Sequence, residues 1–270
     1  MKKFREMKLF LVISVMLSFV IYGCNGEDDD SNNGEPTNND NSAETCTIDD
    51  SKDAVKFGGI FTLTKGGSAN SQAVNKDQLD LVVHQLNNGC GILGDKTTGT
   101  KVEAITRDGQ DDKTITAGLT EELIDEGAKL MVGAGGSSPT SPAAGKSAEL
   151  KVPFGIYFGT SDSLAGCTAD ELADDSVTKE SAPVFAEGKC WDNGGLVFRT
   201  STKSTTWGSM IGKYAATDEG YKSAIRAAAI HRDDTFGTPI ANSFKLGFEG
   251  AGGDRTVSAL VPYAIASDEA

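Results

Sequence analysis

The chain has 270 residues, a formal net charge of −14 at pH 7, five cysteines and two histidines. An acidic chain lacks the basic face that phosphate contacts require, so we expect no nucleic-acid partner. The cysteines show no C-x-x-C spacing and the only histidines are His84 and His231, a pattern that disfavours zinc. We therefore expect neither a metal site nor a cofactor.

The N-terminus has the pattern of an export signal. Basic residues open the chain, and residues 9–20 form an uncharged apolar run. This run is shorter than the roughly 20 apolar residues that a permanent membrane-spanning helix needs. A basic start followed by a short apolar run is typical of a secretory signal that is removed after export. The sequence therefore predicts a signal peptide over residues 1–23.

The apolar run ends in Ile21-Tyr22-Gly23-Cys24, which resembles the lipobox of bacterial lipoproteins. The resemblance implies that Cys24 receives a diacylglycerol group, becomes the mature N-terminus and ties the protein to the cell envelope. Such anchoring is stable because each buried methylene contributes about 0.8 kcal/mol. Asn25 after the cysteine favours the outer membrane of a Gram-negative cell. A coincidental cysteine and an uncleaved anchor are the alternatives.

Residues 24–53 are predicted to be a disordered acidic tether. The stretch from Asn25 to Asp53 holds ten acids and one lysine, so more than half of the formal charge of the chain lies there. Its few apolar side chains cannot bury enough surface to offset the entropy lost on ordering.

Four cysteines remain, and an even number in an exported chain predicts disulfides with three possible connectivities. We favour Cys167–Cys190, because these residues flank one acidic irregular segment that is otherwise a long loop. Cys46–Cys90 is then the remaining pair. Cys46 precedes the first predicted strand and Cys90 follows the first predicted helix, and a β-α unit returns its helix end to the edge where its strand begins.

From residue 55 onward, short β-rich runs alternate with amphipathic helical windows, which predicts an α/β fold with parallel sheets. Strands are predicted at 55–63, 101–106, 130–132, 154–158, 196–198, 224–231 and 256–261. Helices are predicted at 77–86, 114–126, 205–215 and 238–248, with one more starting at Ser141-Pro142. The loops after the strands are rich in Gly, Ser and Thr and lie where ligands bind in such sheets.

Seven stretches in this order resemble the type I periplasmic binding proteins of the branched-chain amino acid family. The similarity runs from Val55 to Tyr263, and the matching stretches are 60–63, 86–94, 122–138, 152–154, 160–164, 198–200 and 233–237. The resemblance implies two Rossmann-like lobes. We expect the first at 54–198, with an insertion at 162–194, and the second at 199–270. Family members continue beyond the position of Ala270, so we expect a C-terminally truncated second lobe.

The resemblance also implies a ligand site. Ser137, beside Ser138, offers a hydroxyl to a ligand carboxylate, Phe158 its main-chain carbonyl, and Thr160 its hydroxyl and N–H. Phe236 stands where the family often has a tyrosine that lines the second lobe. The alternatives are that Ser137 and Thr160 only cap helices, and that Phe236 packs in the core.

The function implied is capture of a small polar ligand, an amino acid or related carboxylate, for an ABC permease, without catalysis. A ligand-sensing subunit and a surface lipoprotein are the alternatives. The enzyme alternatives are weak. Gly145-Lys146-Ser147 lacks the earlier glycine of a P-loop, because Thr140 stands there. No G-x-S-x-G elbow supports a hydrolase. The pairs at 111–112 and 233–234 are predicted to be helix caps.

Overall fold

The computed structural model describes residues 46–65, 69–93, 98–164, 166–184, 186–217 and 225–264. The predicted signal peptide, the lipidation site Cys24 and the predicted tether as far as residue 45 lie outside these ranges. Residues 46–53, which the sequence assigns to the tether, contain the short strand β1 (Thr47–Ile48). In the described part of the chain, no helix is both long enough and apolar enough to cross a bilayer.

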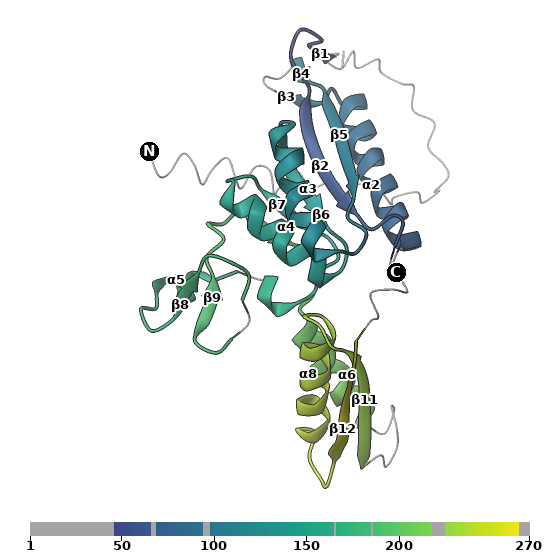
Figure 1. Cartoon of the computed structure of the whole chain (residues 1–270), viewed down its shortest axis with the longest axis vertical. Helices are drawn as coiled ribbons and strands as arrows, with labels where there is room; N and C mark the ends of the chain where they lie inside the picture. Colours follow the sequence, from purple (N-terminus) through teal and green to yellow (C-terminus); the bar gives the residue numbers. More distant parts are fainter. Residues whose placement is uncertain are drawn as a thin grey trace, which may run out of the picture. The chain divides into compact units, whose positions relative to one another are not determined.

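A five-stranded parallel sheet organises the first lobe (Figure 1). Its order is β10-β7-β6-β2-β5, so the first strand along the chain lies between the second and the third. This is the doubly wound order in which the chain reverses direction across the sheet. The strands are β2 (Val55–Phe61), β5 (Val102–Asp108), β6 (Ala128–Gly133), β7 (Phe154–Ile156) and β10 (Val197–Arg199).

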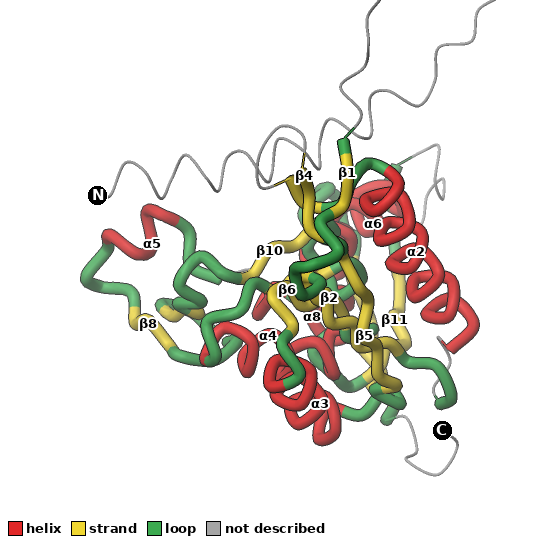
Figure 2. The backbone as a smooth tube through the Cα atoms, turned by 90° about the horizontal axis from the view of Figure 1, so that it is seen from above, coloured by secondary structure: helices red, strands yellow, loops and turns green. Residues whose placement is uncertain are grey.

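Helices cover both faces of this sheet. Helix α2 (Ala69–Asn88) lies on one face, and α3 (Lys113–Asp125) and α4 (Ser137–Glu149) pack together on the other (Figure 2). Asp112 caps α3, because its carboxylate accepts hydrogen bonds from the backbone N–H groups of Thr114 and Ile115. The α/β fold predicted from the alternating periodicity is therefore confirmed.

Two helix starts differ from the prediction. Helix α2 begins at Ala69 rather than Asp77. Its first turns are polar and lack helical periodicity of apolar residues, but α2 packs on β2 and β5. Helix α4 begins at Ser137, so Pro142 lies inside it and does not mark its start. Gly136 is the N-cap residue of α4. The first N–H groups of a helix have no partner within it, so Pro139 in the first turn removes no helical hydrogen bond.

A small second sheet, in the order β1-β4-β3, adjoins the disulfide Cys46–Cys90. Its other strands are β3 (Ile92–Leu93) and β4 (Thr98–Thr100). The pairing is the one favoured by the sequence, with Cys46 before β1 and Cys90 after α2.

The predicted insertion forms a small substructure closed by the disulfide Cys167–Cys190. Its elements are the 3-10 helix η1 (Asp162–Leu164), α5 (Ala169–Ala173), β8 (Thr178–Glu180) and β9 (Lys189–Trp191). Thr168 and Glu171 form a reciprocal capping box at the start of α5. The insertion also contributes to the core, because Trp191 packs in the main hydrophobic cluster with Phe154.

The second lobe is a helix followed by one β-α-β unit, α6 (Ser204–Ala215), β11 (Arg226–Arg232), α8 (Gly237–Glu249) and β12 (Thr256–Tyr263). Strands β11 and β12 pair in parallel, as predicted. The alanine-rich stretch that the sequence predicts as a strand at 224–231 forms β11, which spans Arg226–Arg232. A separate hydrophobic cluster of Ala216, Phe248 and Val257 stabilises this lobe.

Candidate ligand-binding site

The sheet order indicates where a ligand site is expected, which is the point where the connections of the chain go to opposite faces of the sheet. Strands β2 and β6 are neighbours, and β2 leads to α2 on one face whereas β6 leads to α4 on the other. Between two such strands the loops separate and leave a crevice at their carboxyl ends, where ligands of open α/β sheets bind. The predicted residues Ser137, Phe158 and Thr160 all follow carboxyl ends of strands in this sheet.

Ser137 joins two of these loops. Its Oγ accepts hydrogen bonds from the backbone N–H groups of Thr160 (3.1 Å) and Ser161 (3.0 Å), and the residue is 2% exposed. The turns after β6 and β7 therefore meet, as the prediction of a shared site requires. Ser137 is the first residue of α4 and not its cap, because the N-cap is Gly136.

The hydrogen bonds of Ser137 limit what its hydroxyl can offer. A serine hydroxyl has two acceptor lone pairs and one donor proton. The two backbone N–H groups use both lone pairs. The hydroxyl therefore remains a donor only, which suits an acceptor such as a carboxylate oxygen.

Thr160 is held from three sides and is 3% exposed. Its Oγ1 lies 3.0 Å from Ser204 Oγ, and its carbonyl accepts from the Ser204 N–H at 2.7 Å. Its own N–H is donated to Ser137 Oγ. The backbone contact to a ligand that the resemblance implies would therefore require this hydrogen bond to be exchanged.

Arg199 fixes the same turn from the end of β10. Its Nη1 donates to the carbonyls of Ser161 (2.7 Å) and Thr160 (3.3 Å). Partial burial lowers the pKa of the guanidinium, and the nearby Asp162 carboxylate opposes that shift. The sequence does not predict the roles of Ser161 and Ser204 or the bonds from Arg199 to these carbonyls, because such contacts depend on which loops meet in the folded chain.

Phe158 and Ser138 are placed differently from Ser137. The Phe158 side chain is 48% exposed, and its carbonyl accepts no hydrogen bond from the described residues, so it is free as an acceptor. Ser138 instead lines a cavity of about 910 Å³ that α4 shares with the start of α3, residues of the insertion and Thr235.

Phe236 occupies the start of α8 in the second lobe. Its backbone N–H and that of Gly237 donate to Asp234 Oδ1, at 3.0 and 2.7 Å. Asp112 caps α3, as the sequence predicts, whereas the N-cap residue of α8 is Phe236 and Asp234 accepts from the backbone at the helix start without being its N-cap. The Phe236 ring is half-buried.

A buried polar group lies at the carboxyl ends of the strands. Tyr157 donates its hydroxyl to Gln72 Oε1, and burial raises the pKa of Tyr157, so it stays protonated. Thr62 and Gln72 are 0% exposed, yet Thr62 Oγ1 and Gln72 Nε2 have no partner among the described residues. Gly135 has a φ of +98°, and a Cβ there would lie 2.9 Å from Thr62 Oγ1. The sequence analysis did not identify this group.

The residues considered for the enzyme alternatives are not arranged as a phosphate-binding loop or a hydrolase active site in the described part of the chain. Residues 145–147 lie inside α4, and Ser147 Oγ donates to the Val152 carbonyl. His84 Nε2 lies 3.0 Å from Asn88 on α2, whereas His231 Nδ1 lies 2.8 Å from the Arg232 carbonyl. Within the described ranges, no three His, Cys, Asp or Glu side chains gather as metal ligands.

Several solved structures share the fold. A branched-chain amino acid substrate-binding protein LivJ from Streptococcus pneumoniae, with isoleucine, has a TM-score of 0.58 and 17% identity over 80% of this chain and 51% of its own. An ABC transporter solute-binding protein from R. palustris, with benzoate, gives 0.60 and 17% over 80% and 49%. A leucine-binding protein LivK from Thermotoga maritima gives 0.55 and 18% over 78% and 49%.

The chain therefore spans about half the length of these structures. No curated protein sequence matches it. A family model described as "Periplasmic binding protein" matches residues 54–269, which is most of the chain. Together with the doubly wound sheet, this match shows that the chain belongs to the periplasmic binding protein family.

Proposed function

We propose that this protein is an extracytoplasmic, non-catalytic solute-binding lipoprotein that captures a small polar ligand at the turns around Ser137 and Thr160. The observation that carries the proposal is the hydrogen bonding of both turns through one buried hydroxyl at the carboxyl end of a parallel sheet. Family membership supports solute binding. The lipid anchor at Cys24 and an ABC permease partner complete the proposal.

The ligand that fits best is an amino acid or a related carboxylate. Ser137 retains one donor for a carboxylate oxygen, and the free Phe158 carbonyl suits an ammonium group. Two of the similar structures described above contain isoleucine and benzoate, which are both carboxylates. In this proposal Phe236 contributes an apolar surface from the second lobe, whereas Ser138, which lines a separate cavity, makes no contact with the ligand.

Titration calorimetry with isoleucine, leucine and benzoate tests the proposal. We expect one-to-one binding of at least one of them, and Ser137→Ala and Thr160→Ala each to weaken it about tenfold or more, since a hydrogen bond to a charged group is at stake. Ser258→Ala on the exposed strand β12 is the matched control and should leave affinity unchanged. Equal affinity in all three variants, or no saturable binding by any ligand, would contradict the proposal.

A further inference from the structure

A second cavity, of about 610 Å³, lies beneath the disulfide-closed insertion. Its volume is typical of small-molecule sites. Neither Ser137 nor Thr160 lines it. The residues that matter below are Asp162, Glu171, Glu187, Trp191, Arg199 and Lys203.

The cavity has an apolar wall with one unsatisfied donor. Leu164, Val177, Val184 and Val197 line it together with Trp191. Trp191 is 1% exposed, and its indole N–H has no hydrogen-bond partner among the described residues. A buried N–H without a partner costs free energy, and buried indoles normally find one. An acceptor inside the cavity would supply it.

Three acids and three bases line the cavity, and two of the acids already accept hydrogen bonds from neighbouring protein groups. Asp162 is already engaged, because it accepts hydrogen bonds from the N–H and hydroxyl of Thr205. Glu171 is likewise engaged by the Thr168 N–H in the capping box. Lys189 also lines the cavity, but it forms an ion pair with Glu180, which does not line it.

Among the described residues, the cations left to meet a ligand are Lys203 and the Arg199 guanidinium beyond its Nη1. Lys203 is the N-cap residue of α6, and no carboxylate of the described residues lies within ion-pair distance of its ammonium group, although its charge helps to lower the pKa of Glu171. Glu187, on an exposed turn at the rim, is the remaining acid in the lining. The cavity thus presents the Trp191 N–H and two cations next to apolar side chains.

We propose that this cavity is a second binding site, specific for a small carboxylate with an apolar body. The Trp191 N–H, Arg199 and Lys203 meet the carboxylate, and Leu164, Val177, Val184 and Val197 hold the apolar part. The site is built by the insertion and does not depend on the function proposed for the Ser137 turn. Arg199 connects the two, because it also holds the carbonyls of Thr160 and Ser161.

Tryptophan fluorescence reports on this cavity directly. The chain has two tryptophans, and Trp207 on α6 is 41% exposed and does not line the cavity. Trp207→Phe therefore leaves Trp191 as the single reporter. We expect benzoate to change its emission saturably, whereas the isosteric neutral benzamide changes it at concentrations about tenfold higher or not at all, because it lacks the charge.

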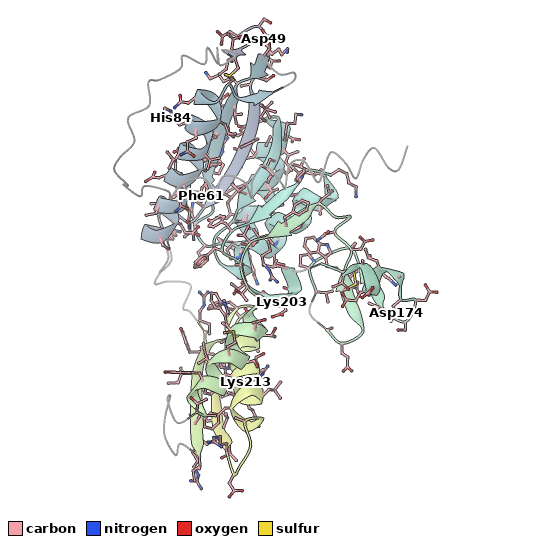
Figure 3. The ribbon with its side chains drawn as sticks, turned by 180° about the vertical axis from the view of Figure 1, so that it is seen from behind. Asp49, Phe61, His84, Asp174, Lys203 and Lys213 are labelled. Atoms are coloured by element: carbon pink, nitrogen blue, oxygen red, sulfur yellow. A yellow bond between two sulfur atoms is a disulfide. The ribbon has the colours of Figure 1, made fainter. Side chains whose placement is uncertain are left out.

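Two lysines of the α6 region supply a matched pair of variants (Figure 3). In the Trp207→Phe background, Lys203→Gln should weaken benzoate binding about tenfold through loss of one charge-assisted hydrogen bond. Lys213→Gln, at the other end of the helix and outside the cavity lining, should leave it unchanged. Both lysines are exposed, so neither change threatens folding.

The disulfides give a second matched pair. Replacing Cys167 and Cys190 by Ser loosens the insertion wall and should abolish the fluorescence change, whereas replacing Cys46 and Cys90, which lie outside the lining, should preserve it. Circular dichroism verifies that each variant is folded.

Ser137→Ala separates this site from the one proposed above. We expect the Trp191 response to survive in that variant even if calorimetry shows binding at the Ser137 turn to be lost. The second site would be overturned by a Trp191 emission that benzoate leaves unchanged, by equal responses in the Lys203 and Lys213 variants, or by a response that disappears with Ser137→Ala.

Discussion

At the scale of single residues, hydrogen-bond capacity determines which roles remain open. Ser137 was expected to contact a ligand or to cap a helix, and the structure gives it a third role, which is to accept two backbone N–H groups from the next loop. Its donor proton remains for a ligand. Thr160, by contrast, uses its N–H and its carbonyl within the protein, and its hydroxyl shares one hydrogen bond with Ser204, so only the remaining capacity of that hydroxyl is open to a ligand.

We expect Ser137→Ala to lower the free energy of unfolding by about 1–3 kcal/mol, because it leaves two buried N–H groups without an acceptor. Urea denaturation followed by circular dichroism measures the change. Ser138→Ala is the neighbouring control. The Ser138 side chain makes no hydrogen bond with the described residues, so we expect this variant to stay within about 0.5 kcal/mol of the parent chain. Equal losses in the two variants would rule out the bridging role of Ser137.

At the scale of elements, the second lobe depends on a close crossing of α6 and α8. Gly208 and Gly212 of α6 and Gly247 of α8 bring the two backbones into contact. A Cβ added at Gly212 would lie 2.2 Å from the Phe244 carbonyl oxygen, and one at Gly208 would lie 2.2 Å from that of Ile240. Backbone atoms cannot move aside as a flexible side chain can, so only glycine fits at these positions.

Gly212→Ala should therefore destabilise the protein by about 1–3 kcal/mol, the usual cost of overpacking a tight interface. Gly118→Ala is the matched control within a helix, because a Cβ there meets nothing within 4 Å. We expect it to stabilise the protein by about 0.4–1 kcal/mol through reduced unfolded-state entropy. Thermal and urea unfolding measure both changes. If the two variants shifted the free energy of unfolding in the same direction, the close crossing of α6 and α8 would not explain the effect of Gly212→Ala.

Element type was readable from the sequence, whereas element boundaries were not. Helix α3 and strand β5 lie within a few residues of their predictions, since each has clear periodicity and Asp112 marks the helix start. The starts of α2 and α4 were placed too late. Their first turns are polar or contain proline, and they are helical because they pack on the sheet and on α3. No local pattern carries that information.

At the scale of the whole molecule, Asp111 couples the two lobes electrostatically. It follows β5 with a φ of +55°, and a Cβ at Gly136 would lie 3.8 Å from its Oδ1. Burial raises the pKa of Asp111, the charge of Arg232 opposes that shift, and the charge of Asp234 adds to it. Asp111 therefore lies close to the turn before Ser137, and its pKa depends on the charges of Arg232 and Asp234 at the end of β11 and after it.

The sign of the resulting pH dependence follows from the raised pKa. The folded state binds the proton of Asp111 more tightly than the unfolded state, so the contribution of this group to stability is complete below the ordinary aspartate pKa of 3.8 and is lost as the pH rises through the raised value. Asp111→Asn removes this loss. We expect the variant to be more stable than the parent chain at pH 7, with the advantage disappearing near pH 3.

Urea unfolding at both pH values measures that difference. Asp112→Asn is the control, because asparagine also caps helices and the pKa of Asp112 is lowered by the N–H bond from Thr114 rather than raised. An Asp111→Asn variant that is less stable than the parent chain at pH 7 would show that the attraction to Arg232 outweighs burial.

The sequence by itself determined the α/β class and the two disulfide pairings favoured here, and its motifs pointed to the family; it also predicts the loops where we propose a ligand site. These are properties of local periodicity, of glycine- and hydroxyl-rich turns and of short-range spacing. Only the tertiary structure decided that Ser137 accepts from Thr160, that Arg199 holds the same turn, and that Trp191 lines a cavity under the insertion. Those facts depend on which loops of a folded sheet meet, and the partners of a hydrogen bond between distant loops leave no periodic trace in the chain.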